Sequence, residues 1–151
     1  MRDSIVTGLI AGILAGLVYL VLAWGLWLAG IAKTTPLHIS AHVFLPPGAA
    51  TGTIPALTFG FIVHLIVSAL FGIIAVGMLR LTGADYLWAK GLAFGGTVYL
   101  LVYGLIAQAF IPAAVLHPDL VTSAVFLFGH LVYGLIAVLF AGYYIQAEER
   151  A

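Results

Sequence analysis

The chain has 151 residues, of which 64% are hydrophobic and 7% are charged, and its formal net charge is zero. A soluble domain is closer to half apolar and a quarter charged, so this composition, with a mean hydropathy of +1.24, excludes an ordinary soluble protein. Five basic residues against five acidic ones give no electrostatic footprint for nucleic acid, and the lack of cysteine excludes disulfides, thiolate metal sites and iron–sulfur clusters.

Four apolar segments follow one another along the chain, and each is long enough to cross a bilayer. A span needs about 20 residues, because a helix rises about 1.5 Å per residue through a hydrocarbon core roughly 30 Å thick. The segments cover residues 4–31, 56–79, 86–111 and 121–146. They lack the apolar and polar alternation of a membrane β-barrel. The sequence therefore predicts an all-α membrane protein, residues 1–151 forming one domain of four transmembrane helices.

The basic residues between these segments predict the orientation of the chain. Arg2, Arg80, Lys90 and Arg150 fall on one side of a four-span arrangement, and Lys33 falls on the other. Because cytoplasmic loops carry the excess of Lys and Arg, both termini are expected in the cytoplasm, with the protein in the cytoplasmic (inner) cell membrane. Residues 32–55 then form a long external loop.

The external loops contain three of the five histidines. His38 and His42 are spaced i, i+4, which on a helix would put both imidazoles on one face, as a zinc or copper site requires. His117, in the other external loop, could supply a third ligand. Prolines near both ends of residues 32–55 leave room for only a short helix, and two exposed loop histidines are the alternative interpretation.

The second and fourth segments look like copies of one another, and so do the first and third. An offset of 66 residues matches His64 with His130, and an offset of 80 matches Gly16 with Gly96 and Tyr19 with Tyr99. A repeated helix hairpin explains both offsets, and two spans per unit give both copies the same orientation. We therefore expect two parallel-repeat hairpins related by an axis along the membrane normal, with 14 additional residues in the first external loop.

The two intramembrane histidines each head a stripe of small residues at helical spacing. Ser68 and Gly72 follow His64, and Gly134 follows His130. Small residues mark the faces where helices approach closely in lipid, and an unpaired imidazole in hydrocarbon is costly, so both rings are expected in the bundle interior. The equal distance of each from the outer end of its helix places them in one layer, with Tyr103 and Ser68 as candidate partners.

Two imidazoles on two helices can hold a b-type haem, with the small residues Ser68 and Gly134 leaving space for the macrocycle. The alternative is that each imidazole is hydrogen-bonded within the bundle and fixes helix register. External positive charge to meet haem propionates is limited to Lys33 and the loop histidines, which weighs against haem.

Several apolar motifs resemble small four-helix prokaryotic integral membrane proteins of an uncharacterised family, a domain of unknown function. They are "HLIVSALFG", "GLAFGGTVYLLVYGLIAQAFIP" and "GHLVYGLIAVLFAGY". The resemblance covers most of the chain and implies the four-helix fold, with His64, His130, Gly134 and Pro112 as family-type positions. It implies no activity, and the long first external loop departs from it.

The sequence contains few residues or motifs that could support catalysis. The five carboxylates lie at membrane edges, and no P-loop, GxSxG or HExxH motif occurs. A coupled transporter would need an intramembrane carboxylate or an interrupted helix, and the sequence shows neither. These features favour a non-enzymatic accessory subunit that packs in a larger membrane assembly, such as a respiratory or redox complex, or with its own copies. A haem- or metal-binding redox module is the alternative, and an oligomeric channel or transporter is a weaker one.

Overall fold

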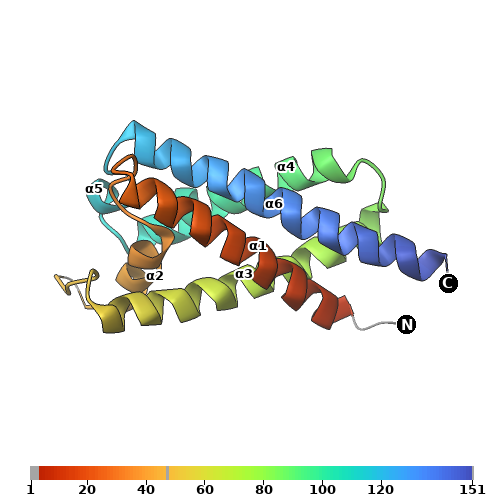
Figure 1. The fold of residues 1–151 in the computed structure, drawn as a ribbon, viewed down its shortest axis with the longest axis horizontal. Coiled ribbons are helices and arrows are strands. Elements are labelled where there is room, and N and C mark those ends of the chain that lie inside the picture. Colours follow the sequence, from red (N-terminus) through yellow and green to blue (C-terminus); the bar gives the residue numbers. More distant parts are fainter. Residues whose placement is uncertain (1–3, 47, 151) are drawn as a thin grey trace.

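The computed structural model describes residues 4–46 and 48–150, and helices make up its architecture with no strand among those residues. Four helical segments are long and apolar enough to cross a membrane: Ser4–Leu28, Ile54–Thr82, Leu87–Ala109 and Leu120–Glu148. The predicted all-α fold with four spans is therefore confirmed. The first helix begins and the last helix ends at the same end of the bundle (Figure 1).

The spans pack as two neighbouring hairpins. Helix α1 (Ser4–Leu28) packs along α3 (Ile54–Thr82), and α4 (Leu87–Tyr99) packs along α6 (Leu120–Glu149). Helix α6 also contacts α1 and α3, so the two hairpins form one bundle. Helix ends follow local signals: the Thr53 side chain accepts a hydrogen bond from the backbone N–H of Ala56, and Gly83 ends α3 with a φ of 83° that favours glycine.

Both hairpins cross where glycines let the backbones meet. A Cβ on Gly12 would collide with the Ser68 carbonyl, and one on Gly72 would collide with the backbone of Gly8 and Gly12. The second hairpin uses the same arrangement: Gly95 faces the carbonyl of His130, and Gly134 faces the backbone of Gly91 and Gly95. The predicted small-residue faces are thus the helix contact faces.

The glycine contacts correspond in a different register from the sequence alignment. Gly12 faces the carbonyl of Ser68 in the first hairpin, and Gly95 faces the carbonyl of His130 in the second. By these contacts Gly12 corresponds to Gly95, an offset of 83 residues (95 minus 12), and Ser68 corresponds to His130, an offset of 62 residues (130 minus 68). The alignment used offsets of 80 and 66, which pair His64 with His130. Close helix approach therefore matches His130 with Ser68, one turn from His64, and the duplication itself stays a prediction.

The third span changes its hydrogen-bond pattern midway. After Tyr99, residues Leu100–Ile106 (η1) form a π-helix and Ala107–Ala109 (η2) a 3₁₀ turn. The span stays helical throughout, as predicted, but the sequence did not predict this change of hydrogen-bond pattern, because no proline interrupts residues 87–109. A π segment shifts the side chains that follow it around the helix axis, and such segments are frequent at functional sites. Tyr103 lies in the middle of η1 and is buried.

The first long loop contains a short helix, α2 (Pro36–Phe44), which begins at a proline, a residue favoured in the first turn. Helix α2 packs against α3 near the start of α3 (Figure 1). Gly60 permits this, because a Cβ there would collide with the Leu37 carbonyl. A second short helix, α5 (Ala113–Leu116), precedes α6. The predicted loop of residues 32–55 thus contains a short helix of the kind for which its prolines leave room.

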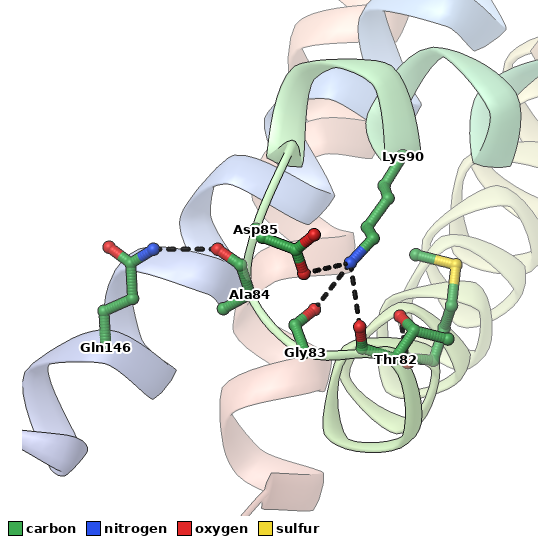
Figure 2. A network of polar contacts seen from close by, with 7 residues as sticks. Thr82, Gly83, Ala84, Asp85, Lys90 and Gln146 are labelled. Atoms are coloured by element: carbon green, nitrogen blue, oxygen red, sulfur yellow. Dashed lines mark hydrogen bonds and ion pairs between the residues drawn. The ribbon is translucent and has the colours of Figure 1, made fainter.

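Polar contacts fasten the turn between α3 and α4. The Lys90 ammonium donates to the carbonyls of Thr82 and Gly83 at 3.0 and 2.9 Å and pairs with Asp85 at 2.8 Å (Figure 2). The Gln146 side chain donates to the Ala84 carbonyl at 2.9 Å, so α6 is tied to the same turn. Charge lies at this membrane-edge turn, where water can solvate it.

Candidate functional site

A cavity of about 170 Å³ lies within the bundle, between α2, α3, η1 and α6. Its walls are mostly aliphatic and aromatic side chains. His64, Ser68, Tyr103 and His130 all line it, so four of the predicted site residues share one space. Gly134 lies instead at the crossing of α4 and α6, where it permits backbone contact. Both imidazoles thus face one interior space, while its position on the outer side of the membrane and any role in holding a cofactor stay predictions.

His64 ties α3 to α1. Its ring is 9% exposed, and Nε2 lies 3.4 Å from the carbonyl oxygen of Gly16. A carbonyl oxygen only accepts, so Nε2 carries the proton, and in the neutral ring Nδ1 is the acceptor. Gly16 leaves the room for this contact, because a Cβ there would press against Ser68.

His130 is anchored differently, on its own helix. Its ring is 6% exposed, and Nδ1 donates to the Phe126 carbonyl at 2.8 Å. Nε2, at the tip of the ring, is then the acceptor in the neutral imidazole. No hydrogen bond from the residues that the structure describes reaches this nitrogen.

Tyrosines gather around the imidazoles: the rings of Tyr19, Tyr99 and Tyr103 contact them, and Tyr133 lines the same cavity. The Tyr19 ring meets the rings of His64 and His130 edge-on, with centroids 5.7 and 4.8 Å apart, and Tyr103 meets His130 in the same way at 5.3 Å. The Tyr133 hydroxyl donates to the Ser68 carbonyl at 2.6 Å. Aromatic edge-to-face contacts of this kind hold neighbouring rings in fixed orientations.

Tyr19 has a buried hydroxyl group that lacks a hydrogen-bond partner. The residue is 2% exposed, and its hydroxyl has no hydrogen-bond partner within the described residues. The Tyr103 phenol lies close enough for an electrostatic contact and a distorted hydrogen bond, but no well-formed hydrogen bond joins the two hydroxyls. Gly129 makes room for the Tyr19 ring, since a Cβ there would collide with it. From the sequence, Tyr19 was noted only as a residue of the predicted repeat, where it matches Tyr99. Tyr133 was not predicted as a site residue, because nothing in the sequence distinguishes it from its apolar neighbours.

The histidines outside the spans do not gather. His38 Nδ1 lies 2.8 Å from the Thr35 hydroxyl, His42 Nδ1 donates to the His38 carbonyl at 3.2 Å, and His117 Nδ1 lies 3.3 Å from the Ser123 hydroxyl. No three His, Asp or Glu side chains form a metal-binding group over the described ranges. The predicted zinc or copper triad is therefore not assembled. Helix α2, which carries His38 and His42, packs against α3, whereas His117 packs beside Tyr103.

Charged groups stay at the ends of the bundle, outside the cavity. At the α2 end, Lys33 pairs with Asp119 at 3.0 Å. The Thr122 backbone N–H, 2.6 Å from the Asp119 carboxylate, and then Lys33 lower the pKa of that carboxyl. Lys90 likewise lowers the pKa of Asp85 at the other end. The described residues that line the cavity include no Asp, Glu, Lys or Arg.

No family model, curated protein or solved structure matches this chain. The resemblance to small four-helix prokaryotic membrane proteins thus stays a prediction, and the cavity has to be interpreted from its own chemistry.

Proposed function

We propose that this integral membrane protein has a non-enzymatic role, in which it binds an apolar, membrane-soluble molecule in the cavity between α2, α3, η1 and α6. One observation carries the proposal: a largely apolar space of about 170 Å³ within a small bundle, with His64, His130 and Tyr103 as its convergent polar groups. A mostly apolar pocket with a few placed polar groups is the usual form of a small-molecule site.

The rim of the cavity supports access from the bilayer. Phe44 of α2, Val67 of α3 and Ile106 of η1 line it, and their side chains are 61%, 37% and 52% exposed. These three side chains are apolar, so the route past them suits a molecule dissolved in lipid. A charged ligand would meet no counter-charge on the cavity wall, and burying it there would be costly. The uncharged wall of the cavity therefore supports a neutral ligand.

The wall chemistry supports binding over catalysis. Imidazoles and phenols line the cavity without a carboxylate to orient or activate them. An accessory role in a larger membrane assembly is consistent with such a binding module, and the small extramembrane mass supports it. Most of the chain is spans, short turns and the helix α2.

The cytoplasmic position of both termini is part of this proposal. Arg80 and Lys90 lie at the end of the bundle where α1 begins, and Lys33 lies at the α2 end. Single cysteines, Asp85→Cys and Gly48→Cys, test it in intact cells with a membrane-impermeant thiol reagent. Position 48 should react from outside and position 85 should not; the opposite pattern would reverse the orientation.

The haem alternative fits these residues less well. Iron binding through Nε2 of His64 would break its hydrogen bond to Gly16, and His64 would lose its tie to α1. A red protein whose Soret band disappears on His64→Ala or His130→Ala would establish the haem alternative instead. The hydrogen-bonded arrangement predicts a colourless protein.

Photolabelling in liposomes tests the binding proposal. A neutral trifluoromethyl-phenyl diazirine dissolved in the lipid should label the cavity wall near Val63 and His130 saturably, because a cavity of limited volume holds a limited number of probe molecules. Labelling at lipid-facing Val21, which is 73% exposed, should rise in proportion to probe concentration.

A matched pair of variants separates the two kinds of labelling. Val63→Phe fills the cavity and should remove the saturable component, whereas Val21→Phe adds the same bulk on the lipid side and should leave it intact. Proportional labelling everywhere, with no saturable component, would refute the binding proposal.

A further inference from the structure

The cavity contains a hydroxyl that the protein itself does not use. Tyr19 lines the cavity, is 98% buried, and its O–H has no hydrogen-bond partner within the described residues. A buried, unmet donor costs free energy, so native proteins rarely keep one without a reason. Tyr103 does not remove the surplus, because two phenols that share one hydrogen bond still leave one O–H to donate.

A free acceptor accompanies this donor. The Phe126 carbonyl holds the proton of His130 on Nδ1, so Nε2 at the tip of the neutral ring presents a lone pair, and no described residue donates to it. The Tyr19 and His130 rings touch, with centroids 4.8 Å apart. A hydroxyl group can donate to an imidazole nitrogen and accept from a phenol at once. A carbonyl or ether oxygen can only accept, and its lone pairs would oppose the lone pair of His130.

The size and wall of the cavity favour a ring. An enclosed apolar space of roughly 150 Å³ holds a benzene molecule, and this cavity measures about 170 Å³. Five Phe and Tyr side chains, Tyr19, Phe44, Phe71, Tyr103 and Tyr133, are in its wall, where edge-to-face contact with a ligand ring is favourable. A longer apolar tail would not fit inside and would leave past the exposed rim at Val67 and Ile106 into lipid.

We infer that the cavity selects a neutral phenol carrying an apolar tail, whose hydroxyl donates to Nε2 of His130 and accepts from the Tyr19 hydroxyl. This inference rests on the proposed binding function and adds the chemical class of the ligand.

Competition against the diazirine probe tests the inference with a matched pair of compounds. 4-Pentylphenol and its methyl ether, 4-pentylanisole, differ in the hydroxyl hydrogen, and both are compared at equal mole fraction in the lipid. The anisole cannot donate to Nε2 of His130, and its lone pairs oppose that nitrogen when its oxygen accepts from Tyr19, so it gains from neither contact. Two hydrogen bonds of about 0.6 kcal/mol or more each then correspond to roughly tenfold preference, so the phenol should compete at about one tenth of the anisole concentration.

Two tyrosine variants locate the preference. Tyr19→Phe removes the unmet hydroxyl and should reduce the phenol preference to about threefold or less, whereas Tyr143→Phe, whose ring is 72% exposed and does not line the cavity, should leave it unchanged. Equal competition by phenol and anisole would overturn the inference while saturable labelling still upheld the binding function. Absence of saturable labelling would overturn both. A preference that stays near tenfold in Tyr19→Phe would also overturn the assigned contact.

Discussion

His64 and His130 occupy two helices of the same bundle and face the same cavity, yet they are anchored in opposite ways. His64 uses the nitrogen at its ring tip to reach across to Gly16 of α1, whereas His130 uses the nitrogen nearest its own backbone to bond Phe126 of the same helix. His64 thus uses its ring tip to join two helices and leaves Nδ1, near its own backbone, as the acceptor, whereas His130 leaves the nitrogen at its ring tip as the acceptor. A repeated residue therefore need not have a repeated role, because the neighbouring carbonyl decides which nitrogen remains available.

The helix crossings that seat the two histidines give the largest expected effect. Gly72→Ala places a methyl group against the backbone of Gly8 and Gly12, and overpacking of this kind costs about 1–3 kcal/mol. Gly77→Ala on the same helix meets no atom within 4 Å and should cost nothing or gain from helix propensity. Reversible unfolding in detergent–lipid mixtures measures both. Equal effects of the two alanines would contradict the crossing.

Volume-conserving substitution of the histidines separates their roles. His64→Leu removes a bond between α1 and α3 and should lower the free energy of unfolding by about 1 kcal/mol. His130→Leu removes only a contact within α6 and should cost less. The same unfolding measurement decides the order, and a larger loss for His130→Leu would reverse the assignment.

Two tyrosines of the cavity wall, Tyr133 and Tyr19, allow the same comparison between a bonded and an unbonded polar group, with smaller expected changes in stability. Tyr133→Phe breaks the bond to the Ser68 carbonyl and should cost about 0.6 kcal/mol or more. Tyr19→Phe deletes a hydroxyl without a partner, so stability should stay the same or rise slightly. If Tyr19→Phe is the more damaging change, its hydroxyl has a protein partner after all.

A histidine outside the spans provides the smallest effect. Burial, and then the charge of His42, lowers the pKa of His38 below 6.5. The folded protein therefore disfavours the charged ring, so this contribution to stability is present above about pH 6.5 and is lost as the pH falls below that value. Acidification should lower the protection factors of the α2 amides, that is, their exchange rates should rise relative to the intrinsic rate at the same pH. In His38→Gln these protection factors should depend much less on pH; an unchanged profile would exclude His38 as the cause.

Hydropathy, helix period and histidine depth predicted the four spans and the shared cavity because each depends on local composition. The π segment from Leu100 and the anchoring of the two imidazoles were not predictable in this way, since they depend on which backbone carbonyl lies within reach after packing. The His38, His42 and His117 triad failed for the same reason: helical spacing within one loop says nothing about the distance to another. Tyr19 was hidden among apolar neighbours, and only its unmet hydroxyl distinguishes it.

Solid-state ¹⁵N spectra of histidine-labelled protein in bilayers at neutral pH test the central claim most directly, with His64→Leu and His130→Leu assigning the signals. The structure predicts opposite tautomers, with the proton on Nε2 of His64 and on Nδ1 of His130. On addition of 4-pentylphenol, the Nε2 signal of His130 should shift and the signals of His64 should stay in place. Identical tautomers, or a ligand-induced shift confined to His64, would contradict the account of a shared cavity with one tied and one available imidazole.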